Sequence, residues 1–410
     1  MKVDAIVLGA GIVGVSVALQ LKRRGLSVAL VDRKAPGHET SFGNAGLIQR
    51  EGVYPYAFPR DMASLAHYAS NRATDVRYHA TAMPKLLPFL YRYWHHSRAD
   101  RHAAIARAYS TLIEHCVTEH RALIQEAGAH SLLRTGGWMK VFRTSRALDA
   151  AIAEARRWEA EYGVPHEALD GNALRAAEPA LRPVLIGAVR YTSSDSVSDP
   201  NGLVTAYARL FERLGGRIVI GDASTLTPSW HVETQEGPVD ADSAVIALGP
   251  WANDATRRLG YALPLAVKRG YHMHYAARDG ARLSQPVLDA EAGYLITPMV
   301  RGIRLTTGVE LGYRDTEKTP VQLEAVEPLA RDVFPLGERV DAEPWLGSRP
   351  CTPDMLPIIG PGTKHRNLWF AFGHAHHGLT LGPITGRLIA EMMTGTPTIA
   401  DPTPFRADRF

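Results

Sequence analysis

The sequence predicts an α/β protein in which a domain built on a parallel sheet is joined to a second, mainly antiparallel β domain. Residues 3–32 form a strand, helix, strand pattern with apolar, β-branched strands, as expected for strands covered on both faces. Residues 259–344 alternate apolar and polar side chains, which is typical of an antiparallel sheet with one wet or cavity-lining face. A chain of 410 residues also exceeds what one hydrophobic core usually supports.

The turn after the first strand contains Gly9, Gly11 and Gly14 in the spacing of a dinucleotide-binding motif. Gly9 permits the tight turn, Gly11 lets the backbone approach a pyrophosphate, and Gly14 lets helix and strand pack closely. The N-terminus of the following helix favours the diphosphate, and Asp32 ends the second strand, where it can accept hydrogen bonds from an adenosine ribose. This context predicts a Rossmann-like dinucleotide site; the alternative is a structural glycine-rich turn.

A second polar loop follows this unit. Small, hydroxyl and amide residues are crowded into positions 40–46, which is typical of a backbone cradle for a polar ligand, although an ordinary surface loop has a similar composition. Further along, residues 83–94 carry apolar and aromatic side chains near helical spacing, with basic neighbours. This pattern fits a core helix, which we favour, or a helix lying on a membrane surface.

The rest of the chain supplies further elements to both domains. We expect one long helix over residues 101–127, a strand at 136–142 and a helix at 146–162. From residue 165 the α/β pattern returns, with strands at 217–220, 230–236 and 243–250. The closing segment is a strand at 367–372, a glycine loop at 373–378 and a helix at 383–393. The positive N-terminal end of this last helix favours a flavin over a nicotinamide, because hydride transfer leaves negative charge on a flavin.

Together these motifs resemble, from end to end, the FAD-dependent amino-acid oxidoreductases that include D-amino acid oxidase, glycine oxidase and sarcosine oxidase, and most of all the bacterial D-amino acid dehydrogenases. The resemblance implies a fold of glutathione-reductase or D-amino acid oxidase type with noncovalent FAD. We accordingly divide the chain into FAD-binding segments 1–60, 165–258 and 345–410, and substrate-domain segments 61–164 and 259–344. The residues assigned to FAD are Gly9, Gly11, Gly14, Asp32, Arg33, Thr40, Ser41, Asn44, Ala45, Gly46, Val219, Gly249, Gly373, His374, Gly378, Leu379 and Thr380.

The resemblance also implies the chemistry. Arg349 would bind the substrate carboxylate in a bidentate geometry that lysine cannot copy, unless it braces its own turn at 350–354. Hydride would pass from Cα to flavin N5, and the imine product would be hydrolysed to a 2-oxo acid. Tyr294 would hold the carboxylate or a lid, or else be a half-buried sheet tyrosine, and His376 is a further catalytic candidate. Candidates for the pocket wall are Tyr54, Tyr56 and His377.

Composition limits the partners. Lys and Arg exceed Asp and Glu by only four, without a run of like charge, so nucleic acid is not expected. Two distant cysteines, Cys116 and Cys351, show neither a disulfide framework nor a zinc site and fit a reducing cytoplasm. No signal peptide or membrane-spanning run is recognisable, which leaves peripheral contact with the inner face of the cell membrane. For the histidines at 374–377 we favour contacts of the flavin loop over a metal site.

Four functions compete. We favour a D-amino acid dehydrogenase that passes its electrons to a quinone-type acceptor. The second is a dehydrogenase or oxidase of cyclic or secondary amino acids, such as D-proline, D-hydroxyproline, sarcosine or glycine. A non-catalytic dinucleotide-binding or electron-transfer subunit is disfavoured by Arg349, because such a module needs no carboxylate clamp. A nicotinamide dehydrogenase is disfavoured by the C-terminal glycine loop.

Overall fold

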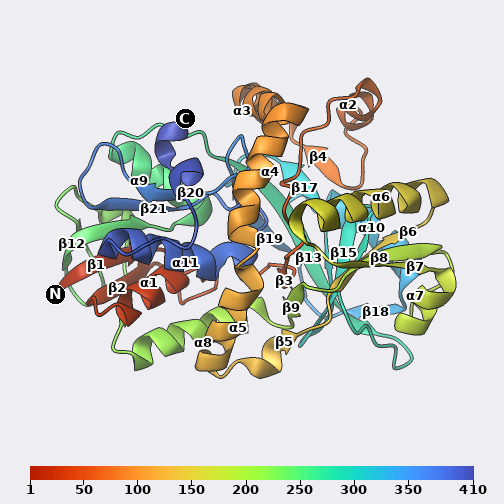
Figure 1. The fold of residues 1–410 in the computed structure, drawn as a ribbon, viewed down its shortest axis with the longest axis horizontal. Helices are drawn as coiled ribbons and strands as arrows, with labels where there is room; N and C mark the ends of the chain where they lie inside the picture. The colour runs from red at the N-terminus through yellow and green to blue at the C-terminus, as the bar shows by residue number, and fades with distance from the viewer.

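The computed structural model describes residues 1–410 and contains two large sheets that lie side by side (Figure 1). The first sheet is parallel except for β11 and β20, each antiparallel to its neighbour. Its central strands β1, β2 and β12 each contain a run of three or four consecutive buried residues, which explains the apolar sequence of those runs. The strands, in spatial order, are β10 (Arg217–Ile220), β2 (Val28–Asp32), β1 (Lys2–Leu8), β12 (Val239–Ile246), β21 (Leu368–Phe372) and β20 (Ile358–Pro361), with β11 (His231–Val232) beside β12.

Helices cover both faces of this sheet. On one face α1 (Ile12–Arg23) packs along α11 (Gly378–Thr394), and Figure 1 shows the red α1 beside the blue α11. A Cβ at Gly386 would lie 2.5 Å from the backbone of Ser16, so the two helices approach this closely because a glycine stands at the crossing. The same layer contains α8 (Pro200–Arg213), and α9 (Ala252–Arg258) packs on the opposite face.

The second sheet is mixed and largely antiparallel, and it is organised around β13 (Ala266–Ala277), which pairs with four other strands. The helices α6 (Ser145–Tyr162), α7 (Gly171–Ala177) and α10 (Val321–Val333) pack against it. The predicted fold class is therefore confirmed. The other strands are β4 (Val76–Tyr78), β17 (Val309–Leu311), β16 (Gly302–Thr306), β15 (Tyr294–Met299), β14 (Val287–Asp289), β6 (Trp138–Phe142), β8 (Gly187–Tyr191), β7 (His166–Asp170), β18 (Leu336–Arg339) and β19 (Trp345–Cys351).

Several expected boundaries differ from the structure. Segment 165–258 was expected in the first domain, but β7 and β8 pair with the second sheet through β6. Segment 345–410 was expected there too, but β19 pairs with β13. The helix expected over 101–127 is two helices, α4 (Ala99–Ile113) and α5 (Cys116–Ala127), and the strand expected at 230–236 is only β11. A third, small sheet joins β3 (Leu47–Ile48), β9 (Asp195–Val197) and β5 (Leu133–Arg134).

Residues 62–96, which contain the helices α2 and α3, form a cap on the edge of the molecule. Figure 1 shows both helices in orange at the top. The helix α3 (Met83–His96) buries Leu86, Phe89, Leu90 and Tyr93 on one face. The core interpretation of residues 83–94 is therefore correct for that face alone, because the opposite face is exposed. The shorter α2 (Met62–Ala69) has no buried residue. No helix of the structure combines the length and the apolar character needed to cross a membrane.

Candidate active site

A cavity of about 1000 Å³ lies between the two large sheets and receives residues from both. We call the part lined by the turn 9–13, the segment 32–45 and the segment 247–255 the cofactor end. We call the part lined by Tyr56, Tyr93, Lys268, Arg349 and His376 the cationic end. The loop 373–378 supplies residues to the wall between them.

The glycine turn is shaped by close backbone contacts. Gly9 has a φ of +104°, and a Cβ there would lie 2.5 Å from the Ala247 carbonyl oxygen. A Cβ at Gly14 would overlap the Gly9 carbonyl oxygen, so Gly14 serves packing and does not line the cavity. Gly11 lines the cavity and caps α1, whose first turn contains no acidic residue. The N-terminal end of α1 therefore offers an anion partial positive charge without a competing carboxylate.

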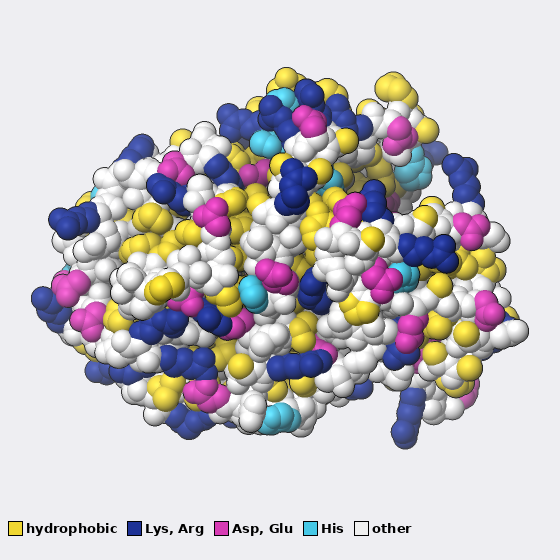
Figure 2. Space-filling view, in the orientation of Figure 1, with side chains coloured by type: hydrophobic (Ala, Val, Ile, Leu, Met, Phe, Trp, Pro, Cys, Tyr) yellow, Lys and Arg dark blue, Asp and Glu magenta, His cyan; other side chains and the backbone are white.

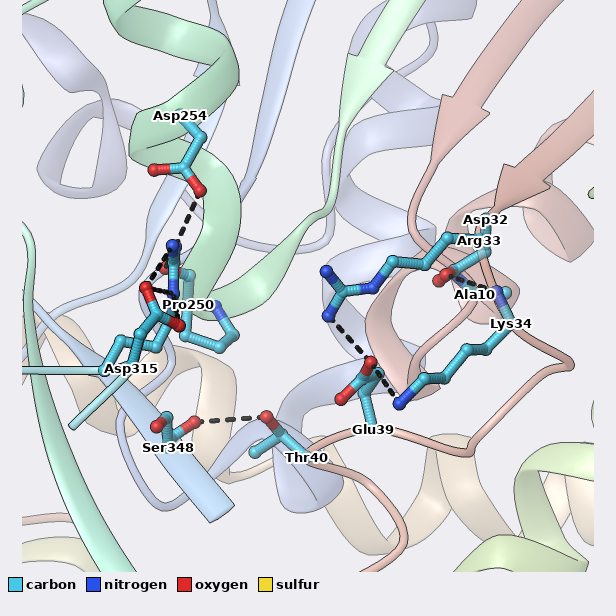
Figure 3. Close-up of polar contacts among 11 residues, drawn as sticks. Ala10, Asp32, Arg33, Lys34, Glu39, Thr40, Pro250, Asp254, Asp315 and Ser348 are labelled. Atoms are coloured by element: carbon cyan, nitrogen blue, oxygen red, sulfur yellow. Dashed lines mark hydrogen bonds and ion pairs between the residues drawn. The ribbon is translucent and has the colours of Figure 1, made fainter. Parts of the chain in front are cut away.

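Asp32 and its neighbours form the side wall of the cofactor end. The Asp32 carboxylate accepts hydrogen bonds from the backbone N–H of Ala10 at 2.6 Å and of Lys34 at 3.1 Å. Arg33 and Lys34 both point toward Glu39 in Figure 3, at N–O distances of 2.7 and 2.9 Å. The Arg33 guanidinium also lies over the Trp251 ring, 4.3 Å from its centroid. The basic charges of this wall are thus paired within the protein.

Across the cofactor end, a second set of charges is paired in the same way. Arg314 donates to Asp254 at 2.7 Å and to Asp315 at 2.9 Å, and Figure 3 shows both carboxylates beside the Pro250 turn. Between the two walls, the Thr40 hydroxyl donates to the Ser348 carbonyl at 3.1 Å.

The loop 40–46 is tied to both domains. Ser41 Oγ accepts from the Ile12 N–H at 3.0 Å, at the start of α1. Asn44 accepts from the Gly46 N–H at 2.8 Å, while Gly46 itself lies outside the cavity, against the Val197 carbonyl. Arg304 donates to the Phe42 and Asn44 carbonyls from the second sheet. Arg304 was missed by the sequence analysis because nothing local links strand 302–306 to this loop.

The other residues assigned to FAD divide into two groups. Gly249, Gly373, His374, Gly378 and Leu379 line the cavity, as do Thr40 and Ala45. Val219 does not, because its side chain is buried in the core on the α9 face of the first sheet. Thr380 also lies outside the cavity wall: its hydroxyl donates to the Leu47 carbonyl and accepts from the Gln49 N–H, both at 3.2 Å. Gly14 thus has the packing role that the motif predicts, whereas Val219, Gly46 and Thr380 do not line the cavity that would hold the ligand.

Three residues assigned to the substrate are placed elsewhere. Tyr294 is 1% exposed, and its hydroxyl donates to the Leu329 carbonyl of α10 at 3.1 Å, so its catalytic assignment is wrong. Tyr54 lies outside the cavity and donates to Glu161 at 2.7 Å. His377 is buried against Tyr109, whose hydroxyl is 2.7 Å from Nδ1. Each of these side chains stabilises a helix contact instead of facing the cavity.

The histidines of loop 373–378 are neutral in the folded protein. His374 Nε2 lies 2.9 Å from the Thr385 hydroxyl, and burial lowers the pKa of His374 to about 3. Burial lowers the pKa of His377 to about 3 as well. The pKa of His376 is held well below its usual value by burial and then by the charges of its neighbours, including Arg349 and Lys268. These rings therefore add no third positive charge to the cationic end.

Arg349 is the central residue of the cationic end. It lies in β19 and donates to the Gly308 carbonyl at 2.7 Å and to the Thr307 carbonyl at 3.3 Å, not to the turn 350–354. No carboxylate pairs with its guanidinium, and burial lowers its pKa. His376 is half-buried beside it and packs against Tyr56, with the two rings tilted and 4.8 Å between their centroids. Tyr56 is 60% exposed and forms the rim of the cavity.

Two lysines also line the cavity. Lys268 Nζ donates to the Tyr93 hydroxyl at 3.1 Å, and Lys140 Nζ lies 5.0 Å from the centroid of the Trp158 ring. The next residue along the strand, Arg269, is fully buried and pairs with Glu310 at 3.0 Å. The alternation of the strand predicts that these two side chains face opposite ways, but not which one faces the cavity.

The residues present fit an FAD. A Cβ at Gly11 would meet only Ser41 Oγ, at 3.3 Å. Because Gly11 has no side chain, space for a diphosphate remains beside the start of α1. Asp32 lies on the same wall for a ribose, and the cavity extends from there to Arg349. When bound, FAD supplies the acceptor of a hydride.

Comparison with known proteins agrees with this geometry. A family model described as FAD dependent oxidoreductase (DAO) matches residues 4–392. The chain is 30% identical to a D-amino-acid oxidase of Bradyrhizobium diazoefficiens, with 98% of each chain covered. It is 32% identical to a D-amino acid dehydrogenase of Methylobacterium radiotolerans, with 96% of this chain and 97% of that one covered.

Solved structures show the same fold. Glycine oxidase from Geobacillus kaustophilus superposes with a TM-score of 0.73 at 22% identity, covering 100% of this chain and 99% of that chain. L-proline dehydrogenase from P. horikoshii superposes with a TM-score of 0.74 at 18% identity, covering 100% and 98%. With its glycine turn, its cavity and a family match over nearly its whole length, the chain belongs to the DAO family and is an FAD-dependent oxidoreductase.

Proposed function

We propose that this enzyme oxidatively deaminates D-amino acids and passes the electrons to a quinone-type acceptor. The observation that carries the proposal is the Arg349 guanidinium, which lines the cavity and has no carboxylate partner in the protein. A cation left unpaired at a half-buried site is costly unless a ligand brings the opposite charge. An amino acid's carboxylate supplies that charge in a geometry that suits a guanidinium.

The reaction follows from how the chain holds this substrate. Arg349 binds the carboxylate, and the neutral His376 ring next to it adds no positive charge that would repel the incoming substrate ammonium. Loss of a hydride from Cα and of a proton from nitrogen converts the neutral amine to an imine, and water releases ammonia and the 2-oxo acid. Two electrons and two protons then reduce the quinone to a quinol, which balances the reaction.

The test is anaerobic bleaching of the purified yellow enzyme by a substrate panel. The panel holds D- and L-amino acids, their amides, D-proline, D-hydroxyproline, sarcosine and glycine. We expect D-amino acids to bleach the flavin and amides to fail, because amides carry no charge for Arg349. Bleaching by L-amino acids alone, by cyclic or secondary amines alone, or by no amino acid would overturn the proposal in favour of another substrate.

We also propose that the FAD is bound without a covalent link. The two cysteines, Cys116 and Cys351, are buried, and burial raises the pKa of both thiols, so neither is a ready nucleophile. Acid precipitation should leave the yellow colour in the supernatant. Colour retained in the pellet would contradict this.

The cap formed by α2 and α3 supports a membrane quinone as the acceptor. Residues 76–99 contain Arg77, Lys85, Arg92 and Arg98 and no acidic residue. Leu87 and Tyr91 on the same outer surface are 57% and 67% exposed. Figure 2 shows hydrophobic and basic side chains together at the outer end of this region. Such a surface fits an anionic lipid headgroup layer, and the neighbouring cavity wall offers an apolar route inward.

Vesicle sedimentation tests this surface. We expect the enzyme to bind vesicles containing phosphatidylglycerol and not pure phosphatidylcholine, and the double change Leu87→Ser, Tyr91→Ser to weaken binding. Val300→Ser removes an equally exposed apolar side chain outside the cap and serves as the control. Equal binding by both variants, or turnover with oxygen as fast as with a quinone analogue, would contradict a membrane quinone as acceptor.

A further inference from the structure

We propose that the cationic end selects amino acids with two carboxylates, Arg349 holding one and Lys268 the other. This inference rests on the proposed function and names the substrate class of the same site. D-Glutamate and D-aspartate are the simplest molecules with the required charges.

The two cations are neighbours by strand pairing. Lys268 of β13 stands opposite Arg349 of β19 in the antiparallel register. Directly opposed residues project from the same face of a sheet with Cβ atoms about 4.5–5.5 Å apart. Both side chains line the cavity. Gly270 makes room for the Arg349 side chain, because a Cβ there would overlap its guanidinium.

Neither cation is neutralised by the protein. Arg349 donates only to two backbone carbonyls, and Lys268 Nζ contacts the Tyr93 hydroxyl at 3.1 Å and the Met355 sulfur at 3.7 Å. Two other arginines of this domain pair with carboxylates, Arg143 with Asp289 at 2.8 Å and Arg269 with Glu310 at 3.0 Å. Arg304 of β16 also donates to backbone carbonyls, but it does not line the cavity. Two adjacent positive charges that repel each other mark a place where the ligand brings two negative ones.

The contacts of Lys268 also suit a distal carboxylate. Its ammonium lies 4.2 Å from the centroid of the Tyr93 ring, so an aromatic face supports the charge without consuming it. The phenol oxygen and the thioether are neutral acceptors, and a lysine has three donors to share. A carboxylate of the substrate can therefore bind Lys268 while Tyr93 stays in place. Because a lysine acts as a point charge, it tolerates distal groups at different chain lengths.

The main experiment compares matched acids and amides during anaerobic flavin reduction. In the wild type we expect D-glutamate to exceed D-glutamine, and D-aspartate to exceed D-asparagine, by about 10- to 100-fold in kcat/KM, the range expected for a charge-assisted contact. Lys268→Met should remove this preference while the D-glutamine value changes little. Lys268→Arg should retain part of it. Lys2→Met, a change at a surface lysine with a 77% exposed side chain, should leave the preference intact.

A binding measurement gives an independent result. Glutarate should raise the melting temperature of the wild type more than butyrate does, and the difference should vanish in Lys268→Met. The inference is overturned if neutral D-amino acids react as well as the diacids, or if glutarate and butyrate stabilise the wild type equally. It is also overturned if Lys268→Met lowers acid and amide equally or loses FAD, because Lys268 would then serve the cofactor. Failure of every amino acid to bleach the flavin would instead overturn the proposed function.

Discussion

The basic side chains at the cofactor end are paired with carboxylates of the protein, whereas those at the cationic end are not. Arg33 and Lys34 share Glu39, and Arg314 lies between two aspartates. Arg349 and Lys268, on the far wall of the same cavity, meet backbone carbonyls, a phenol and a thioether. In the wall of one cavity, Arg33 is thus paired with a carboxylate of the protein, whereas Arg349 and Lys268 are not.

The difference separates a resident ligand from a transient one. FAD stays bound, so the cofactor end is built from backbone contacts and from charges that are already paired with other charges of the protein. A substrate enters and leaves many times, so its end keeps charges that only the substrate can neutralise. The difference also predicts which substitutions strongly reduce FAD binding or activity and which have small effects.

The largest loss of FAD and of folded protein is expected from a substitution in the glycine turn. Gly14→Ala would place a methyl group on the Gly9 carbonyl oxygen, and backbone cannot move aside there without opening the turn. We expect loss of FAD and of most folded protein, measured by the flavin absorbance of the purified sample. Gly163→Ala is the control: it strains a φ of +61° with no atom within 4 Å, costing about 1 kcal/mol, and should retain FAD. Equal flavin content in both variants would show that the turn is not the resident site.

The next largest effect is expected at Arg349. Removing one partner of a buried charge pair costs about 2–5 kcal/mol, so Arg349→Met should lower kcat/KM by roughly 30- to several thousand-fold with FAD still bound. Arg349→Lys should recover only part of the loss. Steady-state kinetics with an acid and its amide measure the effect. Loss of flavin, or an equal loss for acid and amide, would mean that Arg349 braces the carbonyls of residues 307 and 308 instead of binding substrate.

A smaller effect concerns the loop 373–378 between the two ends. His374 and His377 have folded pKa values of about 3, below the 6.5 of an unfolded histidine. Below pH 6.5 the unfolded chain binds more protons, so the stability they contribute is complete above pH 6.5 and is lost as the pH falls toward 3. Each of these two histidines should lower the free energy of unfolding by about 1 kcal/mol as the pH falls from 6.5 to 5.5.

Urea unfolding of the apoprotein at pH 7.5, 6.5 and 5.5 measures this loss. His374→Asn should reduce the slope of stability against pH in that window. His67→Gln, at an exposed position on α2, should leave the slope unchanged. A slope that does not respond to His374 would mean that this ring is protonated in the folded protein and that the cationic end carries a further charge.

The smallest effect is expected at the paired charges of the cofactor end. Glu39→Gln removes the partner of Arg33 and Lys34, both of which are 52% exposed. Exposed pairs of this kind contribute about 0–1 kcal/mol, so the Kd for FAD should change only a few-fold. Titration of the apoprotein with FAD measures this Kd. A loss comparable to that of Arg349→Met would erase the distinction between the two ends.

The parts predicted correctly from the sequence depend on short-range patterns. The first strand, helix and strand follow from apolar runs and from glycines whose roles are local, and Asp32 ends its strand as expected. The break between α4 and α5 was missed because no glycine or proline marks it; the backbone turns at His115, which has a φ of −94° and a ψ of −10°. Domain boundaries near 165 and 345 failed because strand pairing partners lie far away in sequence.

The site residues show the same division. Arg349 was identified by its motif, but the Lys268 partner depends on a register between strands about 80 residues apart. Tyr294 was placed at the wrong surface because alternation predicts two faces of a strand without saying which one meets α10 and which the cavity. Thr380 follows the cavity residues Gly378 and Leu379 in α11, and Val219 comes shortly before Asp222, which lines the cavity, yet both side chains point into helix and strand packing.

The side-by-side packing of α1 and α11 has a consequence for synthesis. As the chain leaves the ribosome, β1 is made at once, but its partner β12 comes after residue 238, and β21 and α11 come after residue 367. Until then the apolar surfaces of β1 and α1 lack their covers, and contacts this distant in sequence form slowly. FAD therefore meets a complete binding surface only near the end of translation, and a nascent chain stalled before α11 should be a target for chaperones.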